Sequence, residues 1–133
     1  MNRDVECEET FVNRFVRPSR KDRWFLMLAN PKKRRKLLQR LYHDVDFIEK
    51  RMFPVPPNRR NHEGLMELLG ERGVRGDEVA YFISPSSDLD CVRSPVTEAI
   101  DQCLMSEGAL MCCQGGRLAY FEPEAMRKGY ILA

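Results

Sequence analysis

Apolar residues recur at helical spacing through the first half of the chain and gather into short continuous runs in the second half. A period of three to four residues is typical of helices that bury one face. Asn30 followed by Pro31 predicts a helix start, because asparagine caps helices and proline suits their first turn. Pro18 and Gly73 predict helix ends. We therefore expect four helices, over residues 10–17, 20–28, 31–43 and 62–72.

Three apolar runs in the second half predict buried strands. A helix capped at Ser94 separates the first run from the second, and the Gly115-Gly116 pair before the third permits the positive φ of a tight turn. Because the runs are apolar at consecutive positions, we expect helices on both faces of the sheet. The runs cover residues 79–83, 109–113 and 117–122.

These elements predict an α+β fold, in which a helical, basic N-terminal half packs on a small three-stranded mixed sheet of β-α-β-β type. A right-handed crossover makes the first two strands parallel, and the glycine turn makes the third antiparallel. Residues 44–60 are rich in proline and predict an extended linker. Residues 1–9 are acidic and lack a period, which predicts a disordered tail. We expect one domain over residues 10–133, with its helical part at 10–72 and its β-α-β-β part at 77–123.

Composition restricts the classes of protein to which the chain can belong. No apolar run approaches the ~20 residues that cross a bilayer, and the polar start lacks the features of a secretory signal. We expect no membrane partner and a cytoplasmic location, or a nuclear one if the source is a eukaryote. Five cysteines, an odd number without a C-x-x-C pair, predict reduced, buried thiols rather than a zinc site. We also expect no cofactor.

Charge is distributed unevenly along the chain. Residues 10–60 carry 15 Lys/Arg against four Asp/Glu, a net charge of +11, whereas residues 61–133 carry six against 12, a net charge of −6. The formal net charge of +2 for all 133 residues hides this difference. Such asymmetry indicates either a polyanionic partner or an acidic half that neutralises the basic half.

The sharpest feature is the run at 31–36, in which five consecutive cations follow Pro31 at a predicted helix start. Like charges there repel one another and oppose the helix dipole. A bound anion offsets that cost, so the run favours nucleic acid or another polyanion as a partner. The alternative is a solvated face without a ligand. The candidate polyanion-binding residues are Arg20, Lys21, Lys32, Lys33, Arg34, Arg35, Lys36 and Arg40.

The loop at 84–90 is a second candidate, because it follows a predicted strand end, where α/β sheets often bind ligands. Asp88 and Asp90, with serines nearby, have the chemistry to hold a divalent metal or a phosphate, although ordinary turn chemistry explains the same residues. A larger carboxylate cluster would need Glu122 and Glu124 at the same sheet end. Parallel strands place Glu122 at the opposite end, and an antiparallel first strand would reverse that. We expect no metal site.

No nucleophile elbow, P-loop, zinc-protease or dinucleotide-binding motif occurs in the chain, so we expect no enzyme. Non-enzymatic binding of nucleic acid or another polyanion is the leading hypothesis. The alternative is a protein-interaction or assembly module, including a homodimer, without a nucleic-acid role. A metal-dependent hydrolase that uses Asp88 and Asp90 is the third hypothesis.

Overall fold

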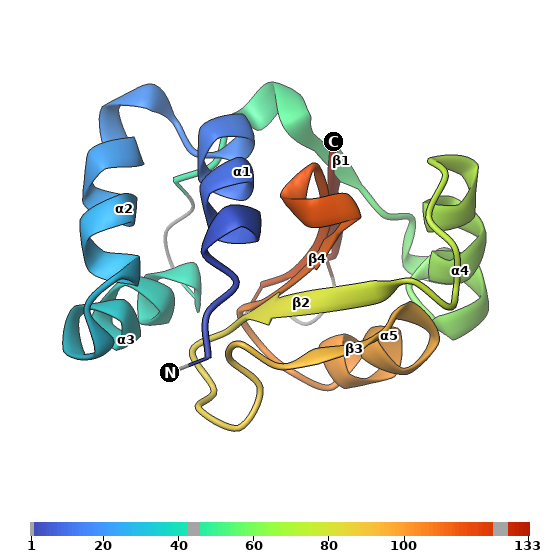
Figure 1. Cartoon of the computed structure of the whole chain (residues 1–133). Coiled ribbons are helices and arrows are strands. Elements are labelled where there is room, and N and C mark those ends of the chain that lie inside the picture. Colours follow the sequence, from blue (N-terminus) through green and yellow to red (C-terminus); the bar gives the residue numbers. More distant parts are fainter. Residues whose placement is uncertain (1, 43–45, 124–127) are drawn as a thin grey trace.

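The computed structural model describes residues 2–42, 46–123 and 128–133. Within these residues, the centre is an antiparallel sheet with the strand order β1-β6-β5-β4-β2-β3 (Figure 1). The longest strands lie in the middle of the sheet, and three-residue strands complete both sides. The strands are β1 (Met52–Pro54), β2 (Val79–Ile83), β3 (Arg93–Pro95), β4 (Ala109–Cys113), β5 (Leu118–Glu122) and β6 (Tyr130–Leu132).

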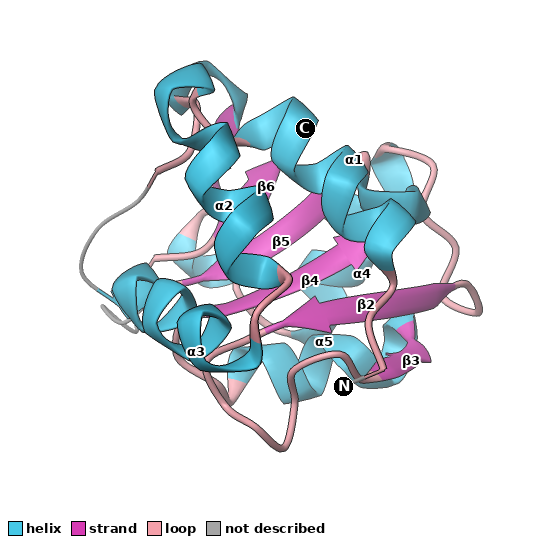
Figure 2. Ribbon diagram, turned by 60° about the vertical axis from the view of Figure 1, so that its left-hand side comes forward, coloured by secondary structure: helices cyan, strands magenta, loops and turns pink. Residues whose placement is uncertain are grey.

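Helices cover both faces of the sheet, as the apolar runs predicted. Helices α1, α2 and α3 pack on one face, and α4 and α5 pack on the other (Figure 1 and Figure 2). We call these groups the α1–α3 layer and the α4–α5 layer. The helices are α1 (Val5–Phe15), α2 (Lys21–Leu28), α3 (Pro31–Gln39), α4 (His62–Glu71) and α5 (Val96–Leu104).

The central strands have no polar face, because alternate side chains enter two separate cores. In β4, Leu110 and Cys112 pack against the α1–α3 layer. Ala109, Met111 and Cys113 point the other way and pack against the α4–α5 layer. A strand whose consecutive residues are all apolar is thus buried on both faces of the sheet, as its sequence predicted.

Helix α1 begins at Val5, inside the segment that we predicted to be a disordered tail. The Asp4 side chain caps the helix and accepts a hydrogen bond from the Cys7 N–H at 3.1 Å. Acidic residues in a first turn suit the helix dipole, and Glu8 is buried rather than solvated. The acidic residues at 4–8 therefore cap and begin a helix instead of forming a disordered tail.

The sheet contains the three strands that we predicted and three short strands that we did not predict. β1, β3 and β6 have three residues each, too few to show a period, and β1 lies within the predicted linker at 44–60. The prediction of a mixed sheet was also wrong, because β2 pairs antiparallel with β4. β3 turns the chain back before α5 begins, so α5 does not cross between parallel strands.

The predicted glycine turn joins β4 to β5. Gln114, Gly115 and Gly116 have φ values of 52°, 67° and 95°, and the left-handed region suits glycine. A Cβ atom on Gly116 would collide with the Cys7 carbonyl oxygen. The turn therefore packs directly against the start of α1 and fixes that helix over the sheet.

Candidate functional site

Helix α3 begins where the sequence predicted, with Asn30 as its cap. The Asn30 Oδ1 atom accepts hydrogen bonds from the N–H groups of Lys32 and Lys33 at 3.1 and 3.2 Å. The Asn30 carbonyl accepts a further bond from the Arg34 N–H at 2.7 Å. Because the protein itself occupies these amides, an anion at this end must be held by side chains. The predicted helix extended to His43, which lies outside the described residues.

The five consecutive cations of α3 divide between the interior and the surface. The Arg34 side chain is 2 % exposed, because its position faces the sheet. The other four are exposed, and α3 contains no acidic residue. Within the described part of the chain, none of their side chains makes an ion pair or a hydrogen bond. We call this set the α3 cationic face; it consists of Lys32, Lys33, Arg35 and Lys36.

Arg34 belongs instead to a buried ion cluster. Its Nη1 lies 2.8 Å from Glu8 Oε2, and its Nε and Nη2 donate to the two Asp90 carboxylate oxygens at 2.7 and 2.9 Å. Burial alone lowers the pKa of Arg34, but the hydrogen bonds to Asp90 and the charge of Glu8 outweigh burial, so its pKa is raised. Arg34 stays charged and ties α3 to α1 and to the loop after β2. It is therefore not available to an external polyanion.

Two further side chains complete this cluster around Glu8. Arg3 donates to Glu8 Oε1 from Nε and Nη2 at 2.9 and 2.8 Å. The Tyr81 hydroxyl donates to Glu8 Oε2 at 2.6 Å and accepts from the Asp4 N–H at 3.1 Å. Burial, followed by hydrogen bonds to Cys91 and Glu8, raises the pKa of Tyr81, which stays protonated. The carboxylates of Glu8 and Asp90 thus face two arginines.

The remaining predicted cations interact with their own layer. Arg20 Nε and Arg40 Nη2 lie 3.7 and 3.5 Å from Oδ1 of Asp46, which is 3 % exposed. Lys21 donates to the Asn13 carbonyl of α1 at 2.8 Å. These three side chains lie around α2 and the end of α3 rather than on the α3 cationic face. The eight predicted residues therefore do not form one continuous, freely available patch.

The acidic residues of the 84–90 loop differ from one another in their surroundings. Asp88 is exposed. Asp90 uses both carboxylate oxygens for Arg34, and its Oδ1 also accepts from the Ser84 N–H at 3.2 Å. Across the described residues, no group of three or more His, Cys, Asp or Glu side chains is placed to hold a metal ion. Asp90 thus works as a structural anchor for Arg34.

Glu122 lies at the same sheet end as this loop, contrary to the parallel arrangement that we predicted, because β2 is antiparallel to β4. Its carboxylate nevertheless faces the α4–α5 layer. It accepts a 2.5 Å hydrogen bond from the Tyr120 hydroxyl and a second one from Arg60 Nη2. Glu124 lies outside the described residues. Glu122 and Asp90 therefore belong to ion clusters on opposite faces of the sheet.

The exposed charges of α3 and of the α4–α5 layer have opposite signs. Helices α4 and α5 contain no Lys or Arg. His62 Nδ1 lies 3.0 Å from Asp101 Oδ1, a partly exposed contact within this layer. The acidic half therefore does not cover the α3 cationic face. The exposed acidic residues of these two helices are Glu63, Glu67, Glu71, Glu98 and Asp101.

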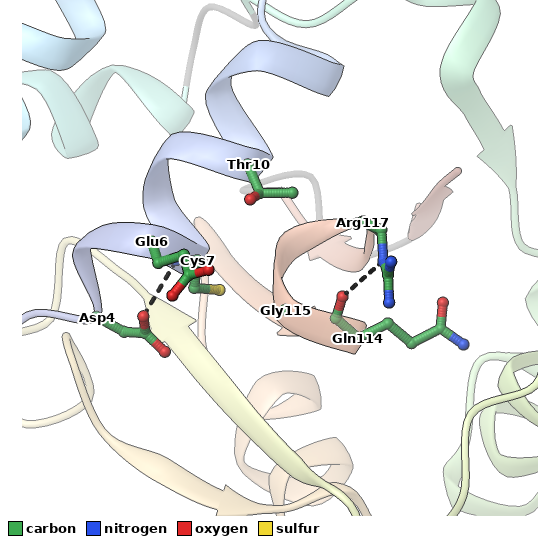
Figure 3. A pocket seen from close by; sticks show the side chains of 7 residues that line it. All are labelled: Asp4, Glu6, Cys7, Thr10, Gln114, Gly115 and Arg117. Atoms are coloured by element: carbon green, nitrogen blue, oxygen red, sulfur yellow. Dashed lines mark hydrogen bonds between the residues drawn. The ribbon is translucent and has the colours of Figure 1, made fainter.

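A separate hollow of about 390 Å³ lies between the start of α1 and the β4–β5 turn (Figure 3). Asp4 and Glu6 line it on the α1 side, and Arg117 lines the other side, where its Nε donates to the Gln114 carbonyl at 3.2 Å. Its charges are mixed, and the side chains of Asp4, Gln114 and Arg117 bond to nearby backbone groups. The hollow offers no concentration of one charge.

Sequence reasoning missed Glu8 as a partner of Arg34, and Tyr81 as a partner of Glu8. Glu8 precedes Phe11, Val12 and Phe15 by three, four and seven residues, which is the spacing of one helix face. That spacing was available in the sequence and indicates an inward carboxylate. No sequence signal links Glu8 to Tyr81, which lies 73 positions away.

Comparisons with known proteins do not assign the chain to a family: no family model, curated protein or solved structure matches it. Among the described residues, no helix has the length and apolar character to span a bilayer.

Proposed function

We propose that the protein binds nucleic acid through the α3 cationic face. The observation that carries this proposal is the exposure of four neighbouring cations on a helix without acidic residues. Lys32 and Lys33 lie in the first turn, where positive charge opposes the helix dipole. Folding alone gives no reason to place them there, whereas phosphate groups stabilise them.

The side chains have the properties of a backbone contact. Lysine and arginine bind phosphate through charge and hydrogen bonds, and such contacts fix a protein on nucleic acid without reading sequence. Asn30, which has an amide suited to base contacts, is used by the cap. We therefore expect binding that depends strongly on salt and weakly on sequence.

Fluorescence anisotropy with short single- and double-stranded DNA and RNA across a salt series tests the proposal. The test variant replaces the α3 cationic face with glutamine and leaves Arg34 in place, because Arg34 maintains the fold. Affinity should fall sharply, and the salt slope for duplex DNA should shrink by about 0.9 for each phosphate that the variant no longer neutralises. The four substitutions are Lys32→Gln, Lys33→Gln, Arg35→Gln and Lys36→Gln.

A matched control removes the same number of positive charges elsewhere, so the two variants share one net charge. Circular dichroism checks that both variants fold. Retained affinity in the control, together with weakened binding in the test variant, supports the placement on α3. Equal weakening would mean that binding depends on net charge alone, and no binding at low salt would overturn the proposal. The control substitutions are Arg59→Gln, Arg72→Gln, Arg75→Gln and Arg117→Gln.

The opposite charges of the α3 cationic face and of helices α4 and α5 favour a second candidate, assembly of copies of this chain. The sheet itself is poorly suited to assembly, because helices cover both faces. At one edge the Met52 N–H donates to the Glu49 carbonyl and Pro54 has no N–H; at the other, β3 ends at Pro95. Sedimentation velocity at low and high salt tests this candidate. Association that salt reverses supports it, and a monomer at high concentration removes it.

A further inference from the structure

A second hollow, of about 390 Å³, adjoins the α3 cationic face. Pro31 and Arg35 line it from α3, and Ser84 and Ser87 line it from the loop after β2. Cys91 also lines it. This volume falls within the range of small-ligand sites, which starts at roughly 300 Å³. The hollow therefore joins the basic helix to the second loop that the sequence singled out.

A β-bulge shapes the loop side of the hollow. Cys91 has a φ of 66°, its N–H donates to the Phe82 carbonyl at 2.9 Å, and the Phe82 N–H donates to the Val92 carbonyl at 2.9 Å. Two residues thus oppose one on β2, which is the pattern of a bulge. The bulge directs the Cys91 side chain toward Tyr81, whose hydroxyl lies 3.2 Å from the thiol sulfur.

One residue that lines the hollow, Ser84, has a buried hydroxyl with an unused donor. Ser84 is 2 % exposed, and its Oγ accepts a hydrogen bond from the Ser86 N–H at 3.1 Å. Within the described residues, the Ser84 hydroxyl proton has no acceptor. A buried hydroxyl without an acceptor lacks a hydrogen bond that an anionic oxygen supplies. Ser87 is exposed at the rim and provides a second hydroxyl.

The charges around the hollow suit one small anion. Asp90 also lines it, but Arg34 engages both carboxylate oxygens, so its negative charge is compensated. Arg35 lines the same hollow, is exposed, and is free of an acidic partner among the described residues. A guanidinium beside hydroxyl donors is an arrangement that binds phosphate.

We propose that this hollow holds a terminal phosphate monoester of the bound nucleic acid. Arg35 and the hydroxyls of Ser84 and Ser87 bind its oxygens, and the terminal nucleotide occupies the remaining space. This inference rests on the proposed function, because the α3 cationic face contacts the internal phosphates beside the hollow. Strand ends with a phosphate are then bound more tightly than ends with a hydroxyl.

The experiment compares one oligonucleotide with and without a 5′-phosphate at a fixed salt concentration, alongside the same pair for the 3′ end. We expect about tenfold tighter binding for one phosphorylated end. Arg35→Gln and Ser84→Ala should each abolish the preference. Lys33→Gln should weaken binding of both forms equally, because Lys33 does not line the hollow. Arg35→Gln alters an exposed side chain, so it decides the matter even if Ser84→Ala misfolds.

Cys91 provides an independent readout. All five cysteines lie in the described part of the chain, and four are buried while Cys91 is only partly buried. Alkylation by iodoacetamide, located by mass spectrometry, should slow at Cys91 when the phosphorylated oligonucleotide binds. Inorganic phosphate alone, at millimolar concentration, should give weaker protection of the same residue. Protection must disappear in Arg35→Gln.

The outcomes separate this inference from the proposed function. Equal binding of both oligonucleotide forms, with binding still abolished in the α3 variant, would overturn the phosphate site and leave the proposed function standing. If no oligonucleotide binds, the proposed function fails together with the assignment of the phosphate to a strand end, and protection of Cys91 by inorganic phosphate decides whether the hollow binds phosphate at all. Absence of that protection would overturn the site as well.

Discussion

The two helical layers differ in where their charges lie. In the α1–α3 layer, the exposed charges of α3 are all cations, whereas α1 and α2 also expose Glu6, Glu9 and Asp22; the acidic residues Glu8 and Asp46 are buried. The α4–α5 layer exposes acidic residues on its helices and buries Glu122 against Arg60. Because consecutive helices share a layer, the charge asymmetry along the sequence becomes an asymmetry across the sheet. A net charge of +2 therefore describes neither surface.

The largest expected effect comes from breaking the ion cluster that holds the basic layer in place. Arg34→Met should reduce the free energy of unfolding by about 3–5 kcal/mol, because it removes the only arginine that pairs with the partly buried Asp90 among the described residues and leaves the buried Glu8 with Arg3 alone. Urea denaturation followed by circular dichroism measures the change. Lys36→Met, two positions along the same helix, should stay within about 0.5 kcal/mol. Similar values for both variants would contradict the anchoring role of Arg34.

The second-largest expected effect is a loss of stability at alkaline pH, caused by buried thiols that face the α4–α5 layer. Burial raises the pKa of Cys113 to about 12, from an ordinary value of 9.0, and burial also raises the pKa of Cys103. Between pH 9 and pH 12, the Cys113 thiol therefore keeps its proton in the folded protein and loses it in the unfolded chain. The free energy of unfolding should therefore fall as pH rises above about 9, by up to about 1.4 kcal/mol per pH unit for each thiol.

Urea denaturation at several pH values between 8 and 11 measures this slope. Cys113→Ala should lower stability at pH 8 but make the alkaline slope shallower. Val96→Ala, a truncation in the same layer, should lower stability at every pH and leave the slope unchanged. An unchanged slope in Cys113→Ala would show that this thiol does not titrate as its burial requires.

A third prediction concerns backbone strain at Cys91. Its φ of 66° costs a residue with a Cβ roughly 1–2 kcal/mol, and glycine avoids that cost. Cys91→Gly should therefore be about 1 kcal/mol more stable than Cys91→Ala. Cys113 lies in a regular strand on the α4–α5 side, where glycine costs conformational entropy. Cys113→Gly should therefore be about 0.5–1 kcal/mol less stable than Cys113→Ala. The same order at both positions would exclude strain as the cause.

Local chemistry explains why part of the fold was predictable. Asn30-Pro31 and Gly115-Gly116 act through their own backbone neighbours, so their roles are readable from the sequence. The apolar runs of β2 and β4 predicted burial on both faces for the same reason. The direction of β2 was not predictable this way, because it depends on three residues, 93–95, that pair only after the chain folds.

The site was predictable in composition but not in geometry. Arg34 looks like its neighbours in the sequence, yet its position on α3 turns it toward Glu8 and Asp90. One helical step, about 100° per residue, separates a buried arginine from an exposed one. Projection of the helix from Leu37 and Leu38 would have identified Arg34 as an inward residue. Its partners, 26 and 56 positions away, required the structure.

The smallest expected effect comes from the first turns of α3 and α4. Both helices have an asparagine cap, but the charged residues of their first turns have opposite signs. Asn61 caps α4, with Glu63 in its first turn, whereas α3 has Lys32 there. Lys32→Glu should raise the free energy of unfolding by about 0.3–1 kcal/mol, because an acidic side chain suits the helix dipole. Glu63→Lys should lower it by a similar amount. Urea denaturation at low ionic strength measures both.

This opposite response links stability to the proposed function. If Lys32→Glu stabilises the fold while it weakens binding of nucleic acid, the lysine is kept at a cost to folding, as expected of a residue that binds a ligand. High salt should shrink both changes in stability, because it screens exposed charges. A decrease in stability in Lys32→Glu would mean that the cations of α3 already find compensation within the folded chain, and the main argument for a polyanionic ligand would fall with it.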